Sequence, residues 1–173
     1  MAQDNKISVV INTYNAEKHL REVLDSVKDF DEIVICDMES KDNTLAIARE
    51  YGCKIVTFEK KNYTIVEPAR NFAVQSATHS WVLVTDADEL VTPELRQYLY
   101  QYIATPNCPE GLFIPRRNRD MNVLDMGRLR DFQLRFFRRD KVYWPPLIHS
   151  IPEIEGKTTK LVDNDKAVFN HLD

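Results

Sequence analysis

Two carboxylates, Asp86 and Asp88, are the residues of this chain best suited to carry chemistry. They follow the apolar run 81–85 directly and stand at positions i and i+2, so in an extended segment both side chains would leave the same face. Two carboxylates held together repel each other unless a cation or hydrogen-bond donors lie between them. Carboxylates with vacant positions suit Mg²⁺ or Mn²⁺ carrying phosphates. The pair predicts a metal–phosphate site, and the alternative is an acidic turn that caps a helix.

Polar groups also follow the first two apolar runs of the chain. The first run ends in Thr13, Tyr14 and Asn15, and the second is stopped by Asp37. Ligands of open α/β sheets bind at the carboxyl ends of the strands. Asp37 is therefore a candidate for hydrogen bonds to a base or ribose, or else a strand-terminal cap. Tyr14 could stack on a base, or could be a partly buried aromatic residue.

One arginine and two histidines complete the set of candidates. Arg70 precedes the fourth apolar run and could pair with a phosphate, with a base carbonyl or simply with Glu67. His149 and His171 each follow an apolar stretch, and either could ligate a metal or bind a phosphate. The alternative for both histidines is a purely structural role.

Four short apolar runs supply the strands that would position these residues. Residues 7–11 are apolar at nearly every position, as are 33–36, which is typical of parallel strands buried on both faces. The runs 54–58 and 81–85 predict a third and a fourth strand. Apolar residues at helical spacing lie between the runs and predict the inward faces of helices: Leu20, Val23, Leu24 and Val27; Leu45 and Ala48; Ala69, Phe72, Ala73 and Ala77. The alternation predicts an α/β fold, with a mostly parallel Rossmann-like central sheet and helices on both faces.

The pattern changes after the fourth run. Thr92 and Pro93 predict the start of a helix whose buried stripe includes Leu95 and Leu99. Beyond Pro106, residues 111–115 and 132–137 predict strands of a less regular second half. We expect a single domain over 1–173, with halves at 6–105 and 106–173 that share one sheet.

Composition and missing motifs exclude several classes of protein. The net charge of −4 disfavours a nucleic-acid partner, and nothing matches GxGxxG, GxxxxGK[ST], GxSxG or HExxH. The start has no apolar signal segment and no run approaches a membrane span, so we expect a cytoplasmic protein. Residues 116–141 carry a charge of +5, which predicts a contact with a phosphorylated acceptor or a membrane surface; a solvated face is the alternative. The arginines concerned are Arg116, Arg117, Arg119, Arg128, Arg130, Arg138 and Arg139.

Four segments, in this order and spacing, carry a resemblance to a known family. They are Ile-Ser-Val-Val-Ile-Asn-Thr-Tyr-Asn at 7–15, Ile-Val-Ile-Cys-Asp-Met-Glu-Ser-Lys-Asp-Asn-Thr at 33–44, Ala-Arg-Asn at 69–71 and Val-Thr-Asp-Ala-Asp-Glu at 84–89. The chain resembles family 2 glycosyltransferases of the GT-A fold. Within them it is most similar to the bacterial lipopolysaccharide core glucosyltransferase-like branch, which residues 135–139 and the stretch from Trp144 to His149 also fit. The resemblance covers about residues 6–150.

The resemblance implies a role for each matching residue. Thr13, Tyr14 and Asn15 would touch the nucleotide, Asp37 the base and Arg70 a uracil. Asp86 would lie near the ribose, Asp88 would bind the Mg²⁺ or Mn²⁺ that bridges the diphosphate, and His171 would meet the metal or the diphosphate. The implied reaction transfers a sugar, expected to be glucose, with inversion. The donor would be a UDP-sugar, and the acceptor a hydroxyl of a cell-envelope glycan or lipid-linked molecule.

Inversion requires a base on the acceptor side, and four residues remain candidates: Glu89, Asp131, Glu153 and His149. The chain departs from the family at Met38, where many members have a second acid, and at Ser150, where this branch often has Glu. It also stops at Asp173, where relatives usually continue. Ser150 and the short C-terminus favour the alternative of a non-catalytic nucleotide-sugar-binding module, whereas the acidic pair argues against it. A DxD-type phosphatase is disfavoured because Asn12 and Thr13, not Asp, end the first strand.

Overall fold

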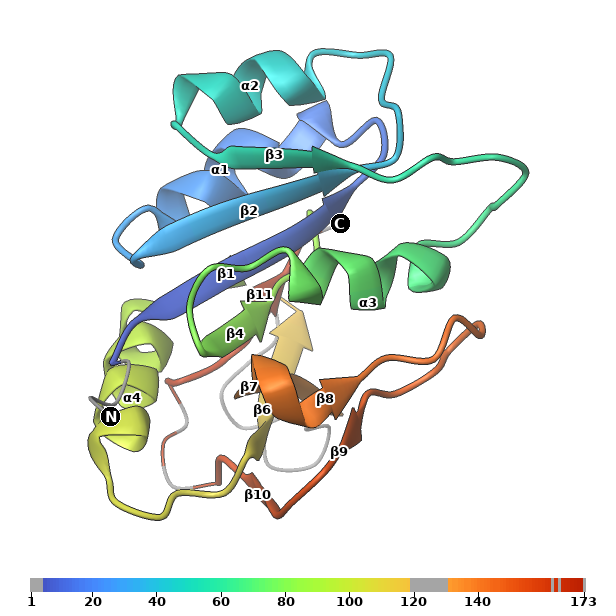
Figure 1. Ribbon diagram of the computed structural model, residues 1–173. Helices are drawn as coiled ribbons and strands as arrows, with labels where there is room; N and C mark the ends of the chain where they lie inside the picture. Colours follow the sequence, from blue (N-terminus) through green and yellow to red (C-terminus); the bar gives the residue numbers. More distant parts are fainter. Residues whose placement is uncertain (1–4, 119–130, 163, 165, 173) are drawn as a thin grey trace.

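The computed structural model describes residues 5–118, 131–162, 164 and 166–172, and Figure 1 shows their arrangement around one curled sheet. Nine strands form this sheet, in the order β3-β2-β1-β4-β7-β6-β11-β5, with β10 paired to β6. Its strands are β1 (Ile7–Thr13), β2 (Glu32–Asp37), β3 (Lys54–Thr57), β4 (Trp81–Val84), β5 (Glu89–Val91), β6 (Gly111–Asn118), β7 (Asp131–Arg138), β10 (Thr158–Lys160) and β11 (Phe169–His171). A separate antiparallel pair joins β8 (Val142–Tyr143) and β9 (Glu153–Ile154).

The predicted parallel strands are confirmed, and both faces of the sheet that they form are covered. β1 lies between β2 and β4, parallel to each, and β3 is parallel to β2. Val9 and Ile11 of β1 pack on one face, whereas Val10 packs on the other. Period-two alternation therefore points apolar side chains to both sides, which explains the unbroken apolar runs.

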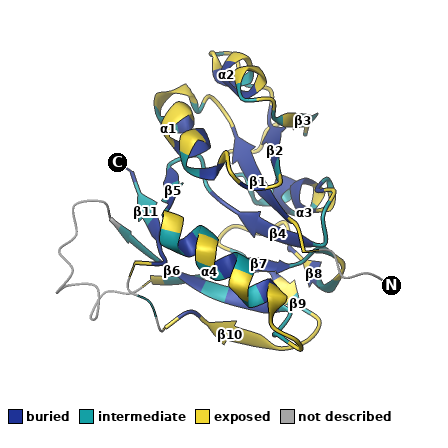
Figure 2. Cartoon of the chain, turned by 90° about the vertical axis from the view of Figure 1, so that its left-hand side faces the viewer, coloured by how far each residue is buried: buried dark blue, intermediate teal, exposed yellow. Residues whose placement is uncertain are grey.

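Helices cover both faces of the sheet, as predicted. α1 (Glu17–Val27), α2 (Thr44–Glu50) and α4 (Pro93–Ala104) belong to one face, and α3 (Glu67–Gln75) covers the other; Figure 2 shows α1 and α3 on opposite sides of the strands. Thr92 caps α4 by accepting a 3.1 Å hydrogen bond from the backbone N–H of Leu95. The expectation that Phe72 points inward is wrong: its side chain is 44% exposed on α3, because Ala69, Ala73 and Val74 form the buried face.

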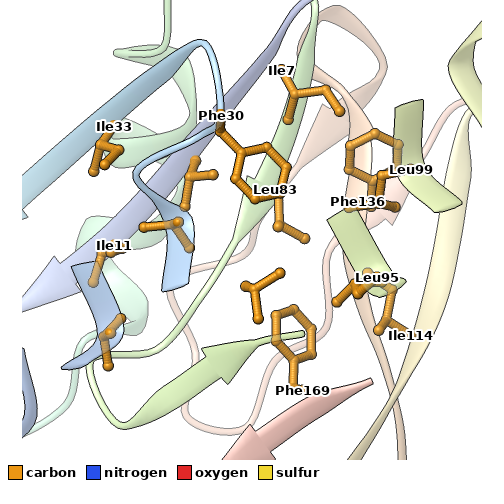
Figure 3. Close-up of a cluster of buried hydrophobic side chains, with 14 of the residues drawn as sticks. Ile7, Ile11, Phe30, Ile33, Leu83, Leu95, Leu99, Ile114, Phe136 and Phe169 are labelled. Carbon is orange, nitrogen blue, oxygen red and sulfur yellow. The ribbon is translucent and has the colours of Figure 1, made fainter. Parts of the chain in front are cut away.

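One apolar core joins the two halves of the sheet. Figure 3 shows its side chains running from Ile33 through Leu83 and Phe136 to Phe169. Trp81 of β4 and Phe136 of β7 stack with ring centroids 5.1 Å apart, at the point where antiparallel β7 meets the parallel strands. The predicted strands at 111–115 and 132–137 are therefore confirmed as β6 and β7, within the same sheet.

The segment that carries the two aspartates differs from the expectation. Asp86 and Asp88 lie in a turn between β4 and β5, not in an extended strand, and the turn is closed by a 3.1 Å hydrogen bond from the N–H of Glu89 to the carbonyl of Asp86. The chain reverses here because β5 pairs antiparallel with β11 instead of continuing β4. The two side chains therefore do not leave one face of a strand.

Candidate active site

A cavity of about 500 Å³ lies at the carboxyl ends of β1 and β4. Tyr14 and Asn15 line it from the turn after β1, and Asp86 and Asp88 line it from the turn after β4. Arg70 of α3 contributes a third side, and the 59–66 connection, which extends past the strand ends in Figure 1, contributes a fourth. The structure thus brings five of the sequence-predicted residues to one cavity at the sheet edge where ligands of α/β folds bind.

Hydrogen bonds join the turns after β1 and β2. The Thr13 hydroxyl donates to Oδ1 of Asp37 at 2.7 Å, and the N–H and hydroxyl of Ser40 donate to the same carboxylate at 2.8 and 2.6 Å. The backbone N–H of Asn15 donates to the Ser40 hydroxyl at 2.8 Å. Thr13 and Asp37 are buried and are not among the cavity-lining residues that the structure describes. Their observed contacts hold the β1 turn in shape.

Tyr14 offers an aromatic face at the cavity. Its side chain is 40% exposed, and the Lys60 ammonium lies 4.8 Å from the centre of its ring. A cation over an aromatic face is a favourable contact, and both groups can rearrange because both lie at the surface. The pair therefore presents a flat ring and a positive charge side by side.

Arg70 is held rigidly in the wall of the cavity. Its guanidinium donates to Oδ1 of Asp86 at 2.8 Å and to the amide oxygen of Asn12 at 3.3 Å, and it lies 5.0 Å from the Trp144 ring centre. The alternative pairing with Glu67 is not among the ion pairs of the described residues. Nε of Arg70 and the amide nitrogen of Asn12 are buried without a hydrogen-bond partner in the described part of the chain, so both are unsatisfied donors of residues that line the cavity.

Two arginines form ion pairs with Asp86. Arg70 binds one of its carboxylate oxygens, and Arg135 binds the other at 3.1 Å. Burial acts to raise the pKa of Asp86, but the two guanidinium charges outweigh it and hold the pKa well below its ordinary value. Hydrogen-bond donors therefore satisfy this carboxylate, and Asp88 is left as the more exposed acid of the pair.

Asp88 meets His171, from the far end of the chain. Nε2 of His171 lies 3.1 Å from Oδ2 of Asp88, because β11 pairs with β5 and the backbone N–H of Leu172 donates to the carbonyl of Asp88 at 2.7 Å. The two side chains are 44% and 33% exposed. A carboxylate and an imidazole with open sides fit a divalent cation that takes its other ligands from phosphate and water. Among the described residues no group of three or more His, Cys, Asp or Glu forms a closed metal site.

The four candidate bases lie in different surroundings. Glu89 has no exposed surface, and its oxygens accept hydrogen bonds from Arg135, Arg116 and the N–H of Asp86. Burial raises the pKa of Glu89, as does the charge of Asp86, against the opposing charges of the arginines. Asp131, at the start of β7, is half-exposed and paired with Arg116 at 2.8 Å.

His149 and Glu153 are both exposed and belong to the connection and strand that follow β8. His149 has a positive φ of 58°. The segment leaves the body of the protein at Trp144, whose N–H donates to the side chain of Asn71 on α3. Neither His149 nor Glu153 is among the described residues that line the cavity.

Sequence reasoning missed several residues of the site. Lys60 and Tyr63 line the cavity from the 59–66 connection, whose Lys-Lys-Asn-Tyr sequence combines charge and an aromatic ring. Asn12 lies at the end of β1 without any distinguishing pattern. Arg135 had a signal: it is a charged residue inside the apolar run 132–137, and it is buried.

The arginine-rich stretch is only partly described. Arg119, Arg128 and Arg130 lie outside the described residues. Among the others, Arg116 pairs with Glu89 and Asp131, Arg117 donates to Asn170, and the Arg138 guanidinium lies 4.6 Å from the Trp81 ring centre. These observed partners lie within the protein. Within the described ranges, no helix has the length and apolar character needed to cross a bilayer.

The fold and the site together define a class, a glycosyltransferase domain of the GT-A type. A sequence model of glycosyl transferase family 2 matches residues 8–156, so the chain belongs to this family. The expected membership of family 2 is confirmed, whereas membership of the lipopolysaccharide core glucosyltransferase-like branch stays a prediction. An uncharacterized glycosyltransferase of Rickettsia conorii is 35% identical over 103 residues, which are 59% of this chain and 36% of the relative. The chain thus spans about a third of the length of this relative.

Comparison of structures agrees with the family. A crystal structure of Staphylococcus aureus TarS, residues 1–349, superposes with a TM-score of 0.73 and 22% identity over 96% of this chain and 60% of that one, which shows the fold. A mannosyltransferase of Pyrobaculum calidifontis, solved with GDP-Man and Mn²⁺, is 26% identical with a TM-score of 0.52, over 69% of this chain and 39% of that one.

Proposed function

We propose that this chain is the catalytic domain of a metal-dependent, inverting glycosyltransferase. It moves a sugar, glucose in our proposal, from a UDP-sugar to a hydroxyl of a cell-envelope glycan or lipid-linked acceptor. The observation that carries the proposal is that Asp88, which lines a cavity with Tyr14 and Arg70, also contacts His171. An aromatic face, unpartnered donors and two potential metal ligands together fit a nucleoside diphosphate.

The donor nucleotide would use the residues of the two turns. Tyr14 would stack on the base, with Lys60 displaced toward the phosphates. Nε of Arg70 and the amide nitrogen of Asn12 would donate to acceptor atoms of the nucleotide, since both are buried donors without a partner among described residues. Asn15 and Asp86 would lie along the ribose, and Thr13 and Asp37 would act by holding the β1 turn.

Charge on the departing diphosphate is the main electrostatic demand of the transfer. Asp88 and His171 would hold Mg²⁺ or Mn²⁺, and the imidazole favours Mn²⁺ because Mg²⁺ prefers oxygen ligands. A bound divalent cation supplies Lewis-acid stabilisation of the leaving diphosphate. For the acceptor proton we propose one of the exposed groups, Asp131, His149 or Glu153.

Relatives with named ligands support the nucleotide and the metal. TarS of Staphylococcus aureus is named a poly(ribitol-phosphate) β-N-acetylglucosaminyltransferase; it is 34% identical over 99 residues, 51% of this chain and 17% of TarS, and has a structure with UDP. Glucosyl-3-phosphoglycerate synthase of Mycobacterium tuberculosis was solved with Mn²⁺, UDP and phosphoglyceric acid; its TM-score is 0.55, with 20% identity over 78% of this chain and 56% of that one. Both names contain a phosphate-bearing molecule, which supports our proposal of a phosphorylated acceptor for this chain.

A thermal-shift panel tests the proposal. UDP, GDP, CDP and dTDP are each added with Mn²⁺, Mg²⁺ or EDTA to the wild type, to Asp88→Asn and to the surface control Asp140→Asn. A ligand at a hundred times its dissociation constant stabilises the folded state by about 2.7 kcal/mol. We expect UDP with Mn²⁺ to raise the Tm of the wild type and of Asp140→Asn, and Asp88→Asn to lose that shift.

Hydrolysis of UDP-glucose, followed as released UDP, then separates an enzyme from a binding module. If UDP is released only when metal is present, and Asp88→Asn abolishes this release, the result supports the transferase. A UDP-induced shift without any release, even with acceptor hydroxyls present, supports the non-catalytic module. If no nucleotide shifts the Tm with any metal, the site assignment is wrong.

A further inference from the structure

A buried ion cluster lies beneath the turn that carries Asp86 and Asp88. Arg135 projects from β7, and its side chain is 7% exposed. One of its guanidinium nitrogens donates to Asp86 at 3.1 Å and another donates to Glu89 at 3.1 Å. One planar group thus bridges the first and last residues of the 86–89 turn.

Glu89 closes this arrangement into a ring. The same oxygen, Oε1, that accepts from Arg135 also accepts the backbone N–H of Asp86 at 2.7 Å. Its other oxygen accepts from Arg116 of β6 at 3.2 Å. The turn is therefore fixed from inside by a side chain at each end, and both ends are anchored to strands of the second half of the sheet.

We propose that Arg135, acting with Glu89, is a positioning residue that holds the 86–89 turn so that Asp88 stands opposite His171. This inference rests on the proposed function, because the purpose of the arrangement is metal-dependent binding of the nucleotide diphosphate. Arg135 itself is beneath the turn and acts through Asp86 and Glu89. The assignment gives Glu89 a structural role in place of the acceptor base.

The composition of the cluster supports a geometric purpose. Buried ion pairs lose solvation, and well-packed apolar residues of similar volume often give equal stability. What a guanidinium adds is a rigid fork that binds two carboxylates at fixed angles. Asp88 sits inside the turn so fixed, and its carbonyl is held from the opposite side by the N–H of Leu172. The position of the Asp88 carboxylate therefore depends both on the ion cluster and on the hydrogen bond from Leu172.

The test compares the affinity of UDP with and without metal. Isothermal titration gives the Kd of UDP in MnCl2 and in EDTA. The ratio of the Kd in EDTA to the Kd in MnCl2 measures the contribution of the metal to binding. The variants are Arg135→Met and Arg135→Lys, with Arg138→Met as the matched control on the same strand, where the arginine packs on Trp81 away from the turn. Arg135→Met should reduce the ratio by about 10- to 100-fold, the usual effect of removing a group that orients a metal ligand.

Three further results make the test specific. The Kd in EDTA should change much less than the Kd in MnCl2, because Tyr14 still offers its ring and Arg70 keeps its own bond to Asp86. Arg135→Lys should retain more of the ratio than Arg135→Met, since it keeps the charge but not the fork. Arg138→Met should keep the wild-type ratio. A folded Arg135→Met with an unchanged ratio overturns the inference.

A double variant provides the test if Arg135→Met alone does not fold. Arg135→Met combined with Glu89→Gln removes one cation and one anion together, so the remaining cluster keeps its charge balance. The same loss of ratio is expected, and an unchanged ratio overturns the inference. If the wild type binds UDP in neither buffer, the proposed function fails and the inference with it. Wild-type binding with an unchanged ratio in the variants overturns only the role of Arg135.

Discussion

The first four strands and the later strands of this molecule contribute differently to the site. Strands β1 to β4 are parallel and mostly apolar, and the turns and connections that follow them line the cavity. The later strands supply ionisable side chains: Arg135 on β7, Glu89 on β5 and His171 on β11. A regular scaffold thus provides the place for a ligand, and the irregular strands beside it provide and fix the polar groups.

We expect the largest effect on stability from a substitution at the seam, the place where β4 of the parallel region pairs with β7. Phe136→Ala removes a fully buried ring that stacks on Trp81, and such a change costs about 3–5 kcal/mol. Denaturant unfolding measures the loss. Phe72→Ala is the control, because that ring is 44% exposed, and it should cost much less. Equal losses would contradict a shared core at the seam.

The parallel region should lose ligand binding when its aromatic face is removed. Tyr14→Ala deletes the ring proposed to stack on the base, and base–aromatic stacking contributes about 1–3 kcal/mol. The Kd for UDP should therefore rise about tenfold or more, as measured by isothermal titration. Tyr143→Ala removes another exposed tyrosine, on β8, and should leave the Kd unchanged. A similar Kd for Tyr14→Ala and the wild type would remove Tyr14 from the site.

The link between the first two turns should have an intermediate effect. Thr13→Val removes the 2.7 Å hydrogen bond to the buried Asp37 carboxylate, which costs about 1–3 kcal/mol when an acceptor loses its partner. Thermal unfolding should show a lower Tm. Thr57→Val, at the exposed end of β3, is the matched control and should be close to neutral. A neutral Thr13→Val would mean that the turns keep their shape without this contact.

The N-terminus of α4 should show a smaller effect. The Thr92 hydroxyl caps the helix and also donates to the carbonyl of Lys166 at 2.7 Å, so it ties α4 to the segment before β11. Thr92→Ala should cost about 1 kcal/mol, measured by denaturant unfolding. Thr105→Ala, at the other end of the helix, should cost less. The reverse order would contradict the capping role.

The smallest effect concerns pH and the N-terminal end of the parallel sheet. Burial acts to raise the pKa of Glu32, but hydrogen bonds from Thr78 and Ser8 outweigh it, so the pKa lies below its ordinary value. A lowered pKa means that the carboxylate stabilises the fold above its unfolded-state pKa, and that this part is lost as the pH falls through the folded-state pKa. Unfolding of Glu32→Gln at pH 7 and at acid pH should therefore show a cost that shrinks in acid. A constant cost would contradict the assignment.

Sequence reasoning predicted the regular region well because local pattern and burial agree there. The run 7–11 is buried throughout and apolar at every position but Ser8, since the sheet is covered on both faces. Strands β5, β10 and β11 were not predicted, because three residues are too few to show a periodicity. Their existence depends on pairing with distant segments, as in the register of His171 with Glu89.

The same limit applies to the site. The Asp86 and Asp88 motif, Tyr14 and Arg70 were found from sequence because they lie at strand ends or carry the family resemblance. The contact of Asp88 with His171 spans 83 positions, and spacing along the chain contains no sign of it; His171 was a candidate because it follows an apolar stretch and through the resemblance, but its partner was not predicted. Arg135 was visible as a charge within an apolar strand, but its two partners depend on how β7 packs under the turn.

The most direct test of the account is the position of the metal. Crystals of the protein grown with UDP and MnCl2 would be measured at an X-ray energy where manganese scatters anomalously. The account predicts one anomalous peak within coordinating distance of the Asp88 carboxylate and Nε2 of His171, with the uracil over Tyr14. A peak that touches neither side chain, or UDP bound elsewhere on the protein, would contradict the assignment of this cavity as the donor site.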